Sequence, residues 1–299
     1  MAPEPLSILT NPLATVEQLT SSSSQFDGVP ADLETSIIHA GARLTQAAGI
    51  LLQLPQDIIA QAIVLFTRFW IGSEGGSLLE HNASDVSAAT IYLVSKLSAY
   101  QKSPRSVINT YAYLASLPAT FPLPSTYIDA QDASTYHVSE GTYLTSRQTL
   151  NANESLVLRI LGFQTHVALP HALSITYMQT LSFIPSPSGT ALAARTFEHL
   201  NAALLSPQLL YLTHPPATLA VAAIYVAARE IGTKLPEGEW WEVFDCERED
   251  LGFLVLAMGS FEGFVREEVQ KWGRRGKVPL TAKQVAGEIE KRTMLEEGA

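Results

Sequence analysis

The spacing of apolar residues along the chain predicts a protein built from α-helices. In the first half, apolar side chains recur every three or four positions in segments 31–52, 54–70, 85–97, 103–113 and 145–163. Alternation with period two, which indicates β-strands, hardly occurs. We therefore expect an all-α fold.

Turn-forming and polar residues mark the ends of these helices and the segments between them. Residues 1–30 are rich in Pro, Ser and Thr, which predicts a mobile N-terminal arm. Three prolines, the first of them Pro118, open a polar insertion over about residues 118–142. Gly162 follows the last helix of the first half, a position where glycine commonly ends a helix.

A short repeat indicates that the second half of the chain has the same plan as the first. The sequence IYLVSK at Ile91–Lys96 has a counterpart, IYVAAR, at Ile224–Arg229. Each copy follows small residues and ends on a cation. We predict two tandem units of five helices, over residues 31–166 and 167–270, and a charged C-terminal tail helix within residues 271–299.

The helix predicted over residues 85–97 carries one lysine, Lys96, near its end. Apolar residues lie on nearly all its sides, so we expect it at the centre of a bundle. A lysine there is costly unless its ammonium reaches water or a carboxylate. One interpretation is that Lys96 simply extends its charge to solvent. The other is an ion pair with Glu154, on the last long helix of the first unit.

Three apolar residues near the ends of the same two helices would surround such a pair: Leu97, Leu158 and Phe163. A charge pair within an exposed apolar surface is typical of a protein–protein interface. The pattern therefore favours a binding surface at this edge of the first unit.

Composition indicates a folded protein and argues against nucleic acid as the main partner. Hydrophobic residues make up 46% of the chain and charged residues 16%, which is enough for a sizeable core. The net charge is -10, whereas phosphate backbones recruit Lys and Arg, so we expect no direct nucleic-acid binding. The N-terminus has neither a basic start nor a long apolar run, so we expect no secretory signal and no membrane anchor.

Patterns typical of catalytic, cofactor or metal sites do not stand out. His166 and His171 are separated by a proline and lack the spacing of four that a metal pair on one helix needs. The single cysteine, Cys246, has no catalytic signature and cannot form an internal disulfide, which favours a reducing compartment. We expect no catalytic residue, cofactor or metal. Trp240 and Trp241 fit either an aromatic anchor that closes the second unit or a peptide-binding platform.

Two tandem five-helix units, with a lysine on the third and a glutamate on the fifth helix of the first, resemble the cyclins. The resemblance covers roughly Asp32–Arg266, and within the family the chain looks most like the cyclin L group. The stretches that carry it are TQAAGILLQLPQ at Thr45–Gln56, VLFTRFW at Val64–Trp70, SPRSVINTY at Ser103–Tyr111, ESLVLRILGFQTHVALPH at Glu154–His171, PPATLAVAAIYVAARE at Pro215–Glu230 and LTAKQVAGEIEKR at Leu280–Arg292.

This resemblance implies a regulatory subunit that activates a cyclin-dependent protein kinase and is not itself an enzyme. It implies that Lys96 and Glu154 bind the kinase, with apolar contacts from Leu97, Leu158 and Phe163. For the cyclin L group it further implies a partner similar to cyclin-dependent kinase 11. The setting would be the nucleus, in pre-mRNA splicing and transcription by RNA polymerase II, with spliceosomal or transcription-associated proteins as further partners.

Departures from the family leave alternatives open. Ser98 and Ala99 stand where many cyclins carry acidic residues, so the charged part of the interface should be weaker or the kinase should differ to match. The first helix lacks the Met-Arg-Ala-Ile-Leu patch that docks substrates, and the chain has no Arg-Ser-rich tail. One alternative is a cyclin-fold scaffold that activates no kinase, within a transcription or RNA-processing complex. Another is a partner of a different transcriptional kinase, similar to cyclins K, T or Q.

Overall fold

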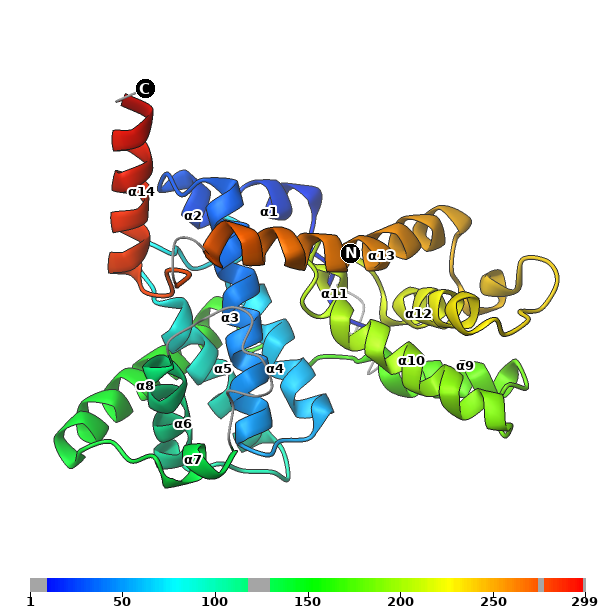
Figure 1. Ribbon diagram of the computed structural model, residues 1–299, viewed down its shortest axis with the longest axis horizontal. Helices are drawn as coiled ribbons and strands as arrows, with labels where there is room; N and C mark the ends of the chain where they lie inside the picture. The colour runs from blue at the N-terminus through cyan, green and yellow to red at the C-terminus, as the bar shows by residue number, and fades with distance from the viewer. Residues whose placement is uncertain (1–9, 118–129, 274–276, 298–299) are drawn as a thin grey trace. The chain divides into compact units, whose positions relative to one another are not determined.

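The computed structural model describes residues 10–117, 130–273 and 277–297 of the chain (Figure 1). These residues form helices, turns and loops, and none of them lies in a strand. The predicted all-α fold is confirmed. The chain divides into two compact units, described separately below. The first unit comprises the described residues within Thr15–Thr165 and Arg266–Ala299, and the second comprises residues 10–14 and His166–Val265.

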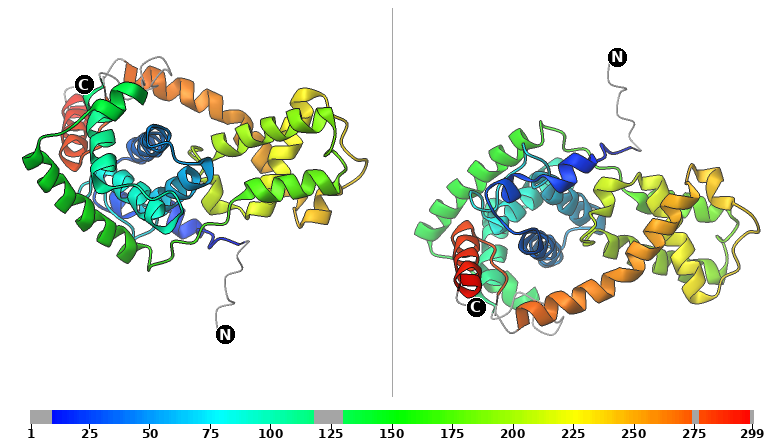
Figure 2. Two further views of the ribbon diagram at one scale, coloured as in Figure 1. Left: turned by 90° about the horizontal axis from the view of Figure 1, so that it is seen from below. Right: turned by 90° about the horizontal axis from the view of Figure 1, so that it is seen from above.

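Five helices of the first unit correspond to the predicted segments. They are α3 (Ala31–Leu51), α4 (Gln56–Phe69), α5 (Ala83–Leu97), α6 (Pro104–Ser116) and α8 (Glu140–Ile160). Helix α5 packs against each of the other four. Figure 2 shows α3 nearly end-on, with α4 and α5 beside it. The central position predicted for α5 is confirmed.

Three polar residues of α5, Ser87, Thr90 and Ser95, are fully buried and form hydrogen bonds. Thr90 Oγ1 and Ser95 Oγ donate to backbone carbonyls three residues earlier, at 2.9 and 2.8 Å. Ser87 Oγ lies 2.7 Å from Thr45 Oγ1 and 2.6 Å from the hydroxyl of Tyr111. Because paired polar groups can be buried at little cost, α5 can be enclosed on all sides as far as Ser95.

The second unit repeats this plan with a shorter fourth element. It contains α9 (Pro170–Thr180), α10 (Pro187–Ala203), the short α11 (Leu210–Thr213), α12 (Pro216–Ile231), the 3-10 helix η1 (Trp240–Phe244) and most of α13 (Arg248–Gly273). Helix α12 packs against α9, α10, α11 and η1, as α5 packs against its neighbours. The predicted tandem arrangement is confirmed, with η1 in place of a full fourth helix.

Corresponding residues of α5 and α12 make corresponding contacts. The ammonium of Lys96 lies 4.9 Å from the centroid of the Tyr92 ring. The guanidinium of Arg229 lies 5.8 Å from the Tyr225 ring and donates to its hydroxyl at 3.2 Å. In both units a cation near the helix end follows a tyrosine by four positions, so the sequence repeat is also a structural one.

Part of the segment expected to be a mobile arm is folded against the helices. It contains two short helices, α1 (Val16–Thr20) and α2 (Ser23–Phe26). Within the first unit, Ser24 is fully buried and its hydroxyl accepts from the amide of Leu78 at 3.0 Å. Within the second unit, the Asn11 side chain donates to the carbonyl of Ala168 and accepts from its amide, at 2.8 and 2.7 Å. Residues 1–9 lie outside the described residues.

The segment predicted as an insertion is partly helical. Its residues 118–129 lie outside the described residues, and α7 (Ala130–Thr135) packs against α6. Helix α8 begins at Glu140 rather than at the expected residue 145. The hydroxyl of Ser139 accepts a hydrogen bond from the amide of Thr142, which caps the helix at this earlier point.

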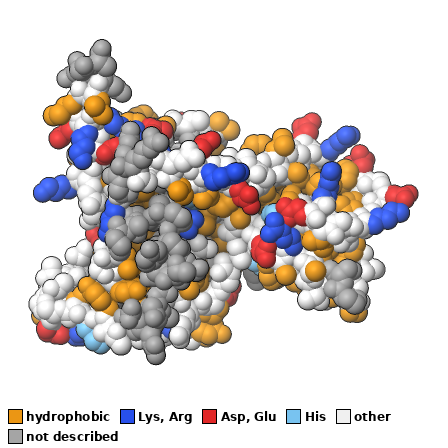
Figure 3. Space-filling model, viewed as in Figure 1, with side chains coloured by type: hydrophobic (Ala, Val, Ile, Leu, Met, Phe, Trp, Pro, Cys, Tyr) orange, Lys and Arg blue, Asp and Glu red, His pale blue; other side chains and the backbone are white. Residues whose placement is uncertain are grey.

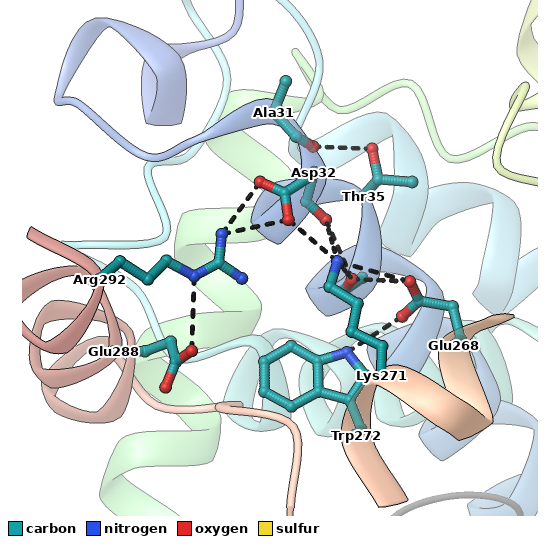
Figure 4. A network of polar contacts seen from close by, with 9 residues as sticks. Ala31, Asp32, Thr35, Glu268, Lys271, Trp272, Glu288 and Arg292 are labelled. Atoms are coloured by element: carbon teal, nitrogen blue, oxygen red, sulfur yellow. Dashed lines mark hydrogen bonds and ion pairs between the residues drawn. The ribbon is translucent and has the colours of Figure 1, made fainter. Parts of the chain in front are cut away.

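The C-terminal helix α14 (Ala282–Glu297) and the end of α13 are attached to the start of α3 within the first unit (Figure 4). Arg292 donates to both oxygens of Asp32, at 3.0 and 3.1 Å, and Lys271 lies 3.0 Å from the same carboxylate. Partial burial raises the pKa of Asp32, but the hydrogen bonds and charges of Lys271 and Arg292 outweigh burial and lower it below its ordinary value. Asp32 is therefore ionised at neutral pH.

A buried carboxylate, Glu268, forms the centre of this attachment (Figure 4). It is 5% exposed and accepts from Ser36 Oγ at 3.0 Å and from the Trp272 indole at 3.1 Å. Lys271 lies 3.6 Å away and donates to Ser36 at 2.8 Å. Each polar group in this part of the network therefore has a partner.

The aromatic residues and the cysteine near η1 are structural. Trp240 is buried against Phe244, with ring centroids 6.3 Å apart, and Trp241 is half-buried, which favours the aromatic anchor over the peptide-binding platform. Burial, together with two nearby carboxylates, raises the pKa of the Cys246 thiol to about 11. Because the thiolate is the reactive form, Cys246 is a poor nucleophile at neutral pH.

Candidate protein-binding surface

The predicted ion pair between Lys96 and Glu154 is present where α5 and α8 lie side by side. Lys96 Nζ donates to Glu154 Oε1 at 2.7 Å. The lysine side chain is 45% exposed and the glutamate side chain 13%. Lys96 therefore does not simply extend into solvent, and this prediction is confirmed.

The surroundings of Lys96 keep its charge in place at the surface. The hydrogen bond to Glu154 raises the pKa of Lys96 above its ordinary value, so the ammonium is protonated throughout the neutral range. The Tyr92 ring lies 4.9 Å away on the preceding turn of α5 and adds a cation–π contact. The ammonium is thus oriented by two neighbours while nearly half of the side chain remains accessible.

Apolar side chains lie along the chain beside both members of the pair. Leu97, next to Lys96, is 65% exposed, and Phe163 is 69% exposed. Leu158 is half-buried, one turn after Glu154 on α8, and its carbonyl accepts from the amide of Phe163 at 2.8 Å. The α5–α8 surface is defined here as these five residues: Lys96, Leu97, Glu154, Leu158 and Phe163.

The end of α8 determines how Phe163 is presented. Gly162 has φ +56° and Phe163 has φ +62°, so two successive residues are left-handed. The amide of Gly162 donates to the carbonyl of Arg159, and the amide of Phe163 donates to the carbonyl of Leu158. These two hydrogen bonds form a Schellman motif at the end of the helix. The helix end predicted at Gly162 is confirmed. The left-handed Phe163 was not predicted, because that conformation is uncommon for an aromatic residue and no local pattern indicates it.

We expect Gly162→Val to lower the free energy of unfolding by about 1–3 kcal/mol, since a β-branched residue is strained at positive φ. A Cβ at this position meets no atom within 4 Å in the described structure, so the loss would come from the backbone and not from a clash. Urea unfolding measures the change. Gly141→Ala, in the first turn of the same helix and equally open, should instead stabilise by about 0.5–1 kcal/mol. Equal effects at both positions would contradict this explanation.

A second exposed aromatic residue extends the surface beyond the sequence prediction. Tyr100, three residues after Leu97, is 52% exposed, and its amide donates to Ser98 Oγ at 3.0 Å. Large exposed aromatic and aliphatic side chains beside an oriented charge pair are suited to binding a protein rather than to catalysis.

The first unit also contains a cavity of about 600 Å³ between α3, α5, α6 and residues 277–284. Small residues leave this space open, among them Ala40, Ala47 and Ala88. Tyr111 lines it, and burial raises the pKa of the tyrosine, so its hydroxyl stays protonated and bound to Ser87. The cavity lies on α3, the helix in which the Met-Arg-Ala-Ile-Leu patch is absent.

Two further properties of the described residues bear on other functions. No group of three or more His, Cys, Asp or Glu side chains that could hold a metal ion occurs there. None of the helices in these residues has the length and apolar content needed to cross a membrane.

Comparison with curated proteins shows extensive similarity to L-type cyclins, although no protein-family model matches the chain. It is 28% identical to cyclin-L1 of Danio rerio over 249 residues and 30% identical to cyclin-L2 of Homo sapiens over 290 residues. These alignments cover 83% and 95% of this chain but 46% and 49% of the relatives. The chain therefore spans about half the length of these animal proteins.

A fungal relative matches over most of both chains, and a solved structure shares the fold. The chain is 31% identical to an uncharacterised cyclin-L1-like protein of Schizosaccharomyces pombe, over 81% of this chain and 88% of that protein. In the crystal structure of the yeast RNA Pol II CTD kinase CTDK-1 complex, one chain superimposes with a TM-score of 0.66 at 13% identity, over 95% of this chain and 84% of that one. The structural likeness shows the fold, and the sequence similarity shows the family. The chain belongs to the cyclin family, as a cyclin-L-like member.

Proposed function

We propose that this protein is a regulatory subunit that binds and activates a cyclin-dependent protein kinase through the α5–α8 surface. The observation that carries the proposal is the 2.7 Å pair of Lys96 and Glu154 beside exposed Leu97 and Phe163. The apolar side chains would supply contact area, and the charges would fix the orientation of the partner. The subunit itself performs no chemistry in this proposal.

Activation would follow from preferential binding to one state of the kinase. A protein kinase is active when its regulatory helix brings a lysine–glutamate pair together. A subunit that binds only this arrangement shifts the population toward it, and a change from 1:99 to 99:1 needs about 5.5 kcal/mol of preference. Complete burial of two large apolar side chains contributes about 1.5–3 kcal/mol each, and their sum is comparable to this preference.

The proposed setting is the nucleus, in transcription by RNA polymerase II and pre-mRNA splicing, with a kinase similar to cyclin-dependent kinase 11. Support comes from the cyclin-L1 and cyclin-L2 relatives and from the solved neighbour, which is an RNA Pol II CTD kinase complex. Ser98 and Ala99 carry no charge, so we propose a partner whose facing surface relies less on basic residues than that of other cyclin-dependent kinases.

Purification of the tagged chain from its native source, followed by mass spectrometry, tests this function. We expect a cyclin-dependent kinase at about one copy per chain. Mixing the two purified proteins should raise phosphorylation of an RNA polymerase II C-terminal-domain peptide at least tenfold over the kinase alone. Recovery of a transcription or splicing complex without a kinase would instead establish the non-activating scaffold.

A further inference from the structure

One side of α13 in the second unit carries exposed apolar residues that the α5–α8 surface does not include. Leu256 is 75% exposed, and Phe253, one turn earlier, is 49% exposed. Leu251, Leu254 and Met258, on the other side of the same helix, are buried. The core of the second unit therefore buries only one side of α13. Large apolar side chains on the other side remain exposed.

The exposed residues share one face because their positions differ by three, four or seven. This face, called the α13 face below, consists of six exposed residues, Glu249, Gly252, Phe253, Leu256, Gly259 and Ser260, and the half-buried Gly263. From Glu249 to Gly263 it is about 21 Å long at 1.5 Å per residue. That length matches four turns of a second helix.

Three glycines make this face smooth. Glycine within a helix is less stable than alanine, so each needs a reason. A Cβ added at Gly252, Gly259 or Gly263 would meet no atom within 4 Å in the described structure. Packing inside the chain therefore does not require them. Their missing side chains leave shallow space beside Leu256, which allows another backbone to approach closely.

Phe253 is held in place at the edge of the face. Its ring stacks on that of His214, with centroids 5.3 Å apart and an interplanar angle of 17°. An aromatic ring fixed by a neighbour loses little conformational entropy when a partner covers it, as is typical of residues that dominate binding energy. Phe253 and Leu256 are therefore the expected anchors of the α13 face.

The charges in the sequence around the start of α13 indicate the chemistry of a partner. Residues 237–262 contain eight Asp or Glu and a single basic residue, Arg248. In the space-filling view, hydrophobic side chains reach the surface of the second unit among charged ones (Figure 3). An apolar strip within an acidic segment favours a partner with an apolar strip and basic flanks, because opposite charges guide and orient association.

We propose that the α13 face is a docking site for a basic amphipathic helix of a partner protein. Leu256 and Phe253 would contact the apolar side of that helix, the glycines would admit its backbone, and the acidic residues would face its lysines or arginines. This proposal does not rest on the proposed kinase function, because the α13 face and the α5–α8 surface share no residue.

A designed 20-residue peptide serves as the probe, with leucine and alanine on one helical face and lysine on the other. Calorimetry should show that it binds the full chain in 150 mM salt. Leu256→Ser and Gly259→Gln should each weaken binding at least tenfold. Val243→Ser is the matched control, since Val243 is also 75% exposed but lies on η1, and it should change the affinity less than twofold. The unfolding temperatures of all three variants should be measured and compared with that of the unchanged chain, as a check that the variants are folded.

Several results would overturn the proposal. The lysine peptide could fail to bind measurably. A peptide with glutamate in place of lysine, or a shuffled peptide, could bind as tightly as the lysine peptide. Leu256→Ser and Val243→Ser could weaken peptide binding by the same factor. Leu256-dependent dimerisation in sedimentation, or Leu256-dependent binding to anionic vesicles, would identify a second copy or a membrane as the occupant instead. Leu256→Ser should leave kinase activation unchanged, so this test and that of the kinase function can fail separately.

Discussion

Lys96→Glu is expected to abolish kinase binding while leaving the fold nearly as stable as before. At the proposed interface the new carboxylate would face the kinase together with Glu154, and removal of one partner of a desolvated charge pair costs about 2–5 kcal/mol. A loss of at least about 30-fold in affinity should follow. In the free protein, exposed ion pairs contribute only about 0–1 kcal/mol, and Lys96 is 45% exposed. Calorimetry with the purified kinase and thermal unfolding of the free chain measure the two effects.

The chain offers a closely matched control for this charge reversal. Arg105 pairs with Glu140 at 2.8 Å and is 46% exposed, so Arg105→Glu breaks an equivalent pair in the same unit. Glu140 and Glu154 are 14 positions apart on α8, about 21 Å. Arg105→Glu should therefore keep kinase binding within threefold. A large loss of stability in Lys96→Glu alone would show that Lys96 is structural.

A double charge reversal distinguishes a role of the ion pair in the fold from a role in kinase binding. Lys96→Glu combined with Glu154→Lys restores an internal ion pair with the charges exchanged. If the pair only supports the fold, the double variant recovers both stability and binding. If the charges contact the kinase, stability returns and binding does not, and this second outcome is the one we expect.

Glu268→Ala should lower the free energy of unfolding of the first unit by about 3 kcal/mol. Removal of this carboxylate leaves the buried Trp272 indole without its acceptor and takes an ionic partner from Lys271, whereas Ser36 Oγ keeps the carbonyl of Asp32 at 2.9 Å. Each buried group left unpaired costs about 1–3 kcal/mol, and loss of a buried ionic partner costs more than loss of an exposed one. Urea unfolding followed by circular dichroism should show a lower midpoint with an unchanged slope.

The adjacent Glu267 is the control for this variant, because it lies on the same helix but is exposed. Glu267→Ala should change the free energy of unfolding by no more than about 0.5 kcal/mol. Glu268→Gln, which keeps one acceptor oxygen, should fall between the two. A loss below about 1 kcal/mol for Glu268→Ala would mean that the attachment of α13 and α14 contributes little to the fold.

The Lys96–Glu154 contact could be predicted from local patterns together with the family resemblance. Helix α5 is apolar on nearly all sides, so its single cation had to lie at an edge, and the neighbouring long helix carried one suitable carboxylate. The repeat at Ile91–Lys96 and Ile224–Arg229 similarly indicates two units from the sequence alone. The role of this surface in kinase binding stays a prediction.

Other features had no signal in the sequence. Serines and asparagine in residues 1–30 are typical of a mobile segment, yet Ser24 and Asn11 are fixed by hydrogen bonds to residues 54 and 157 positions away. The sequence predicted five helices in the second unit without locating the fourth, and in the structure this place is taken by the short η1, after which the chain turns at Asp245 with φ +53°. A left-handed aspartate is uncommon, and no composition rule identifies where it occurs.

The sequence by itself determined the helical class, the two-unit plan, the central position of α5 and the helix end at Gly162. These depend on apolar periodicity and on the backbone freedom of glycine, which act within a few residues of each other. The tertiary structure alone decided the partners of Glu268, the packing of Ser24 and Asn11, and the smooth exposed face of α13. Such contacts join residues as far apart as Ser36 and Glu268, 232 positions, and depend on which surfaces the folded helices bury and which they leave open.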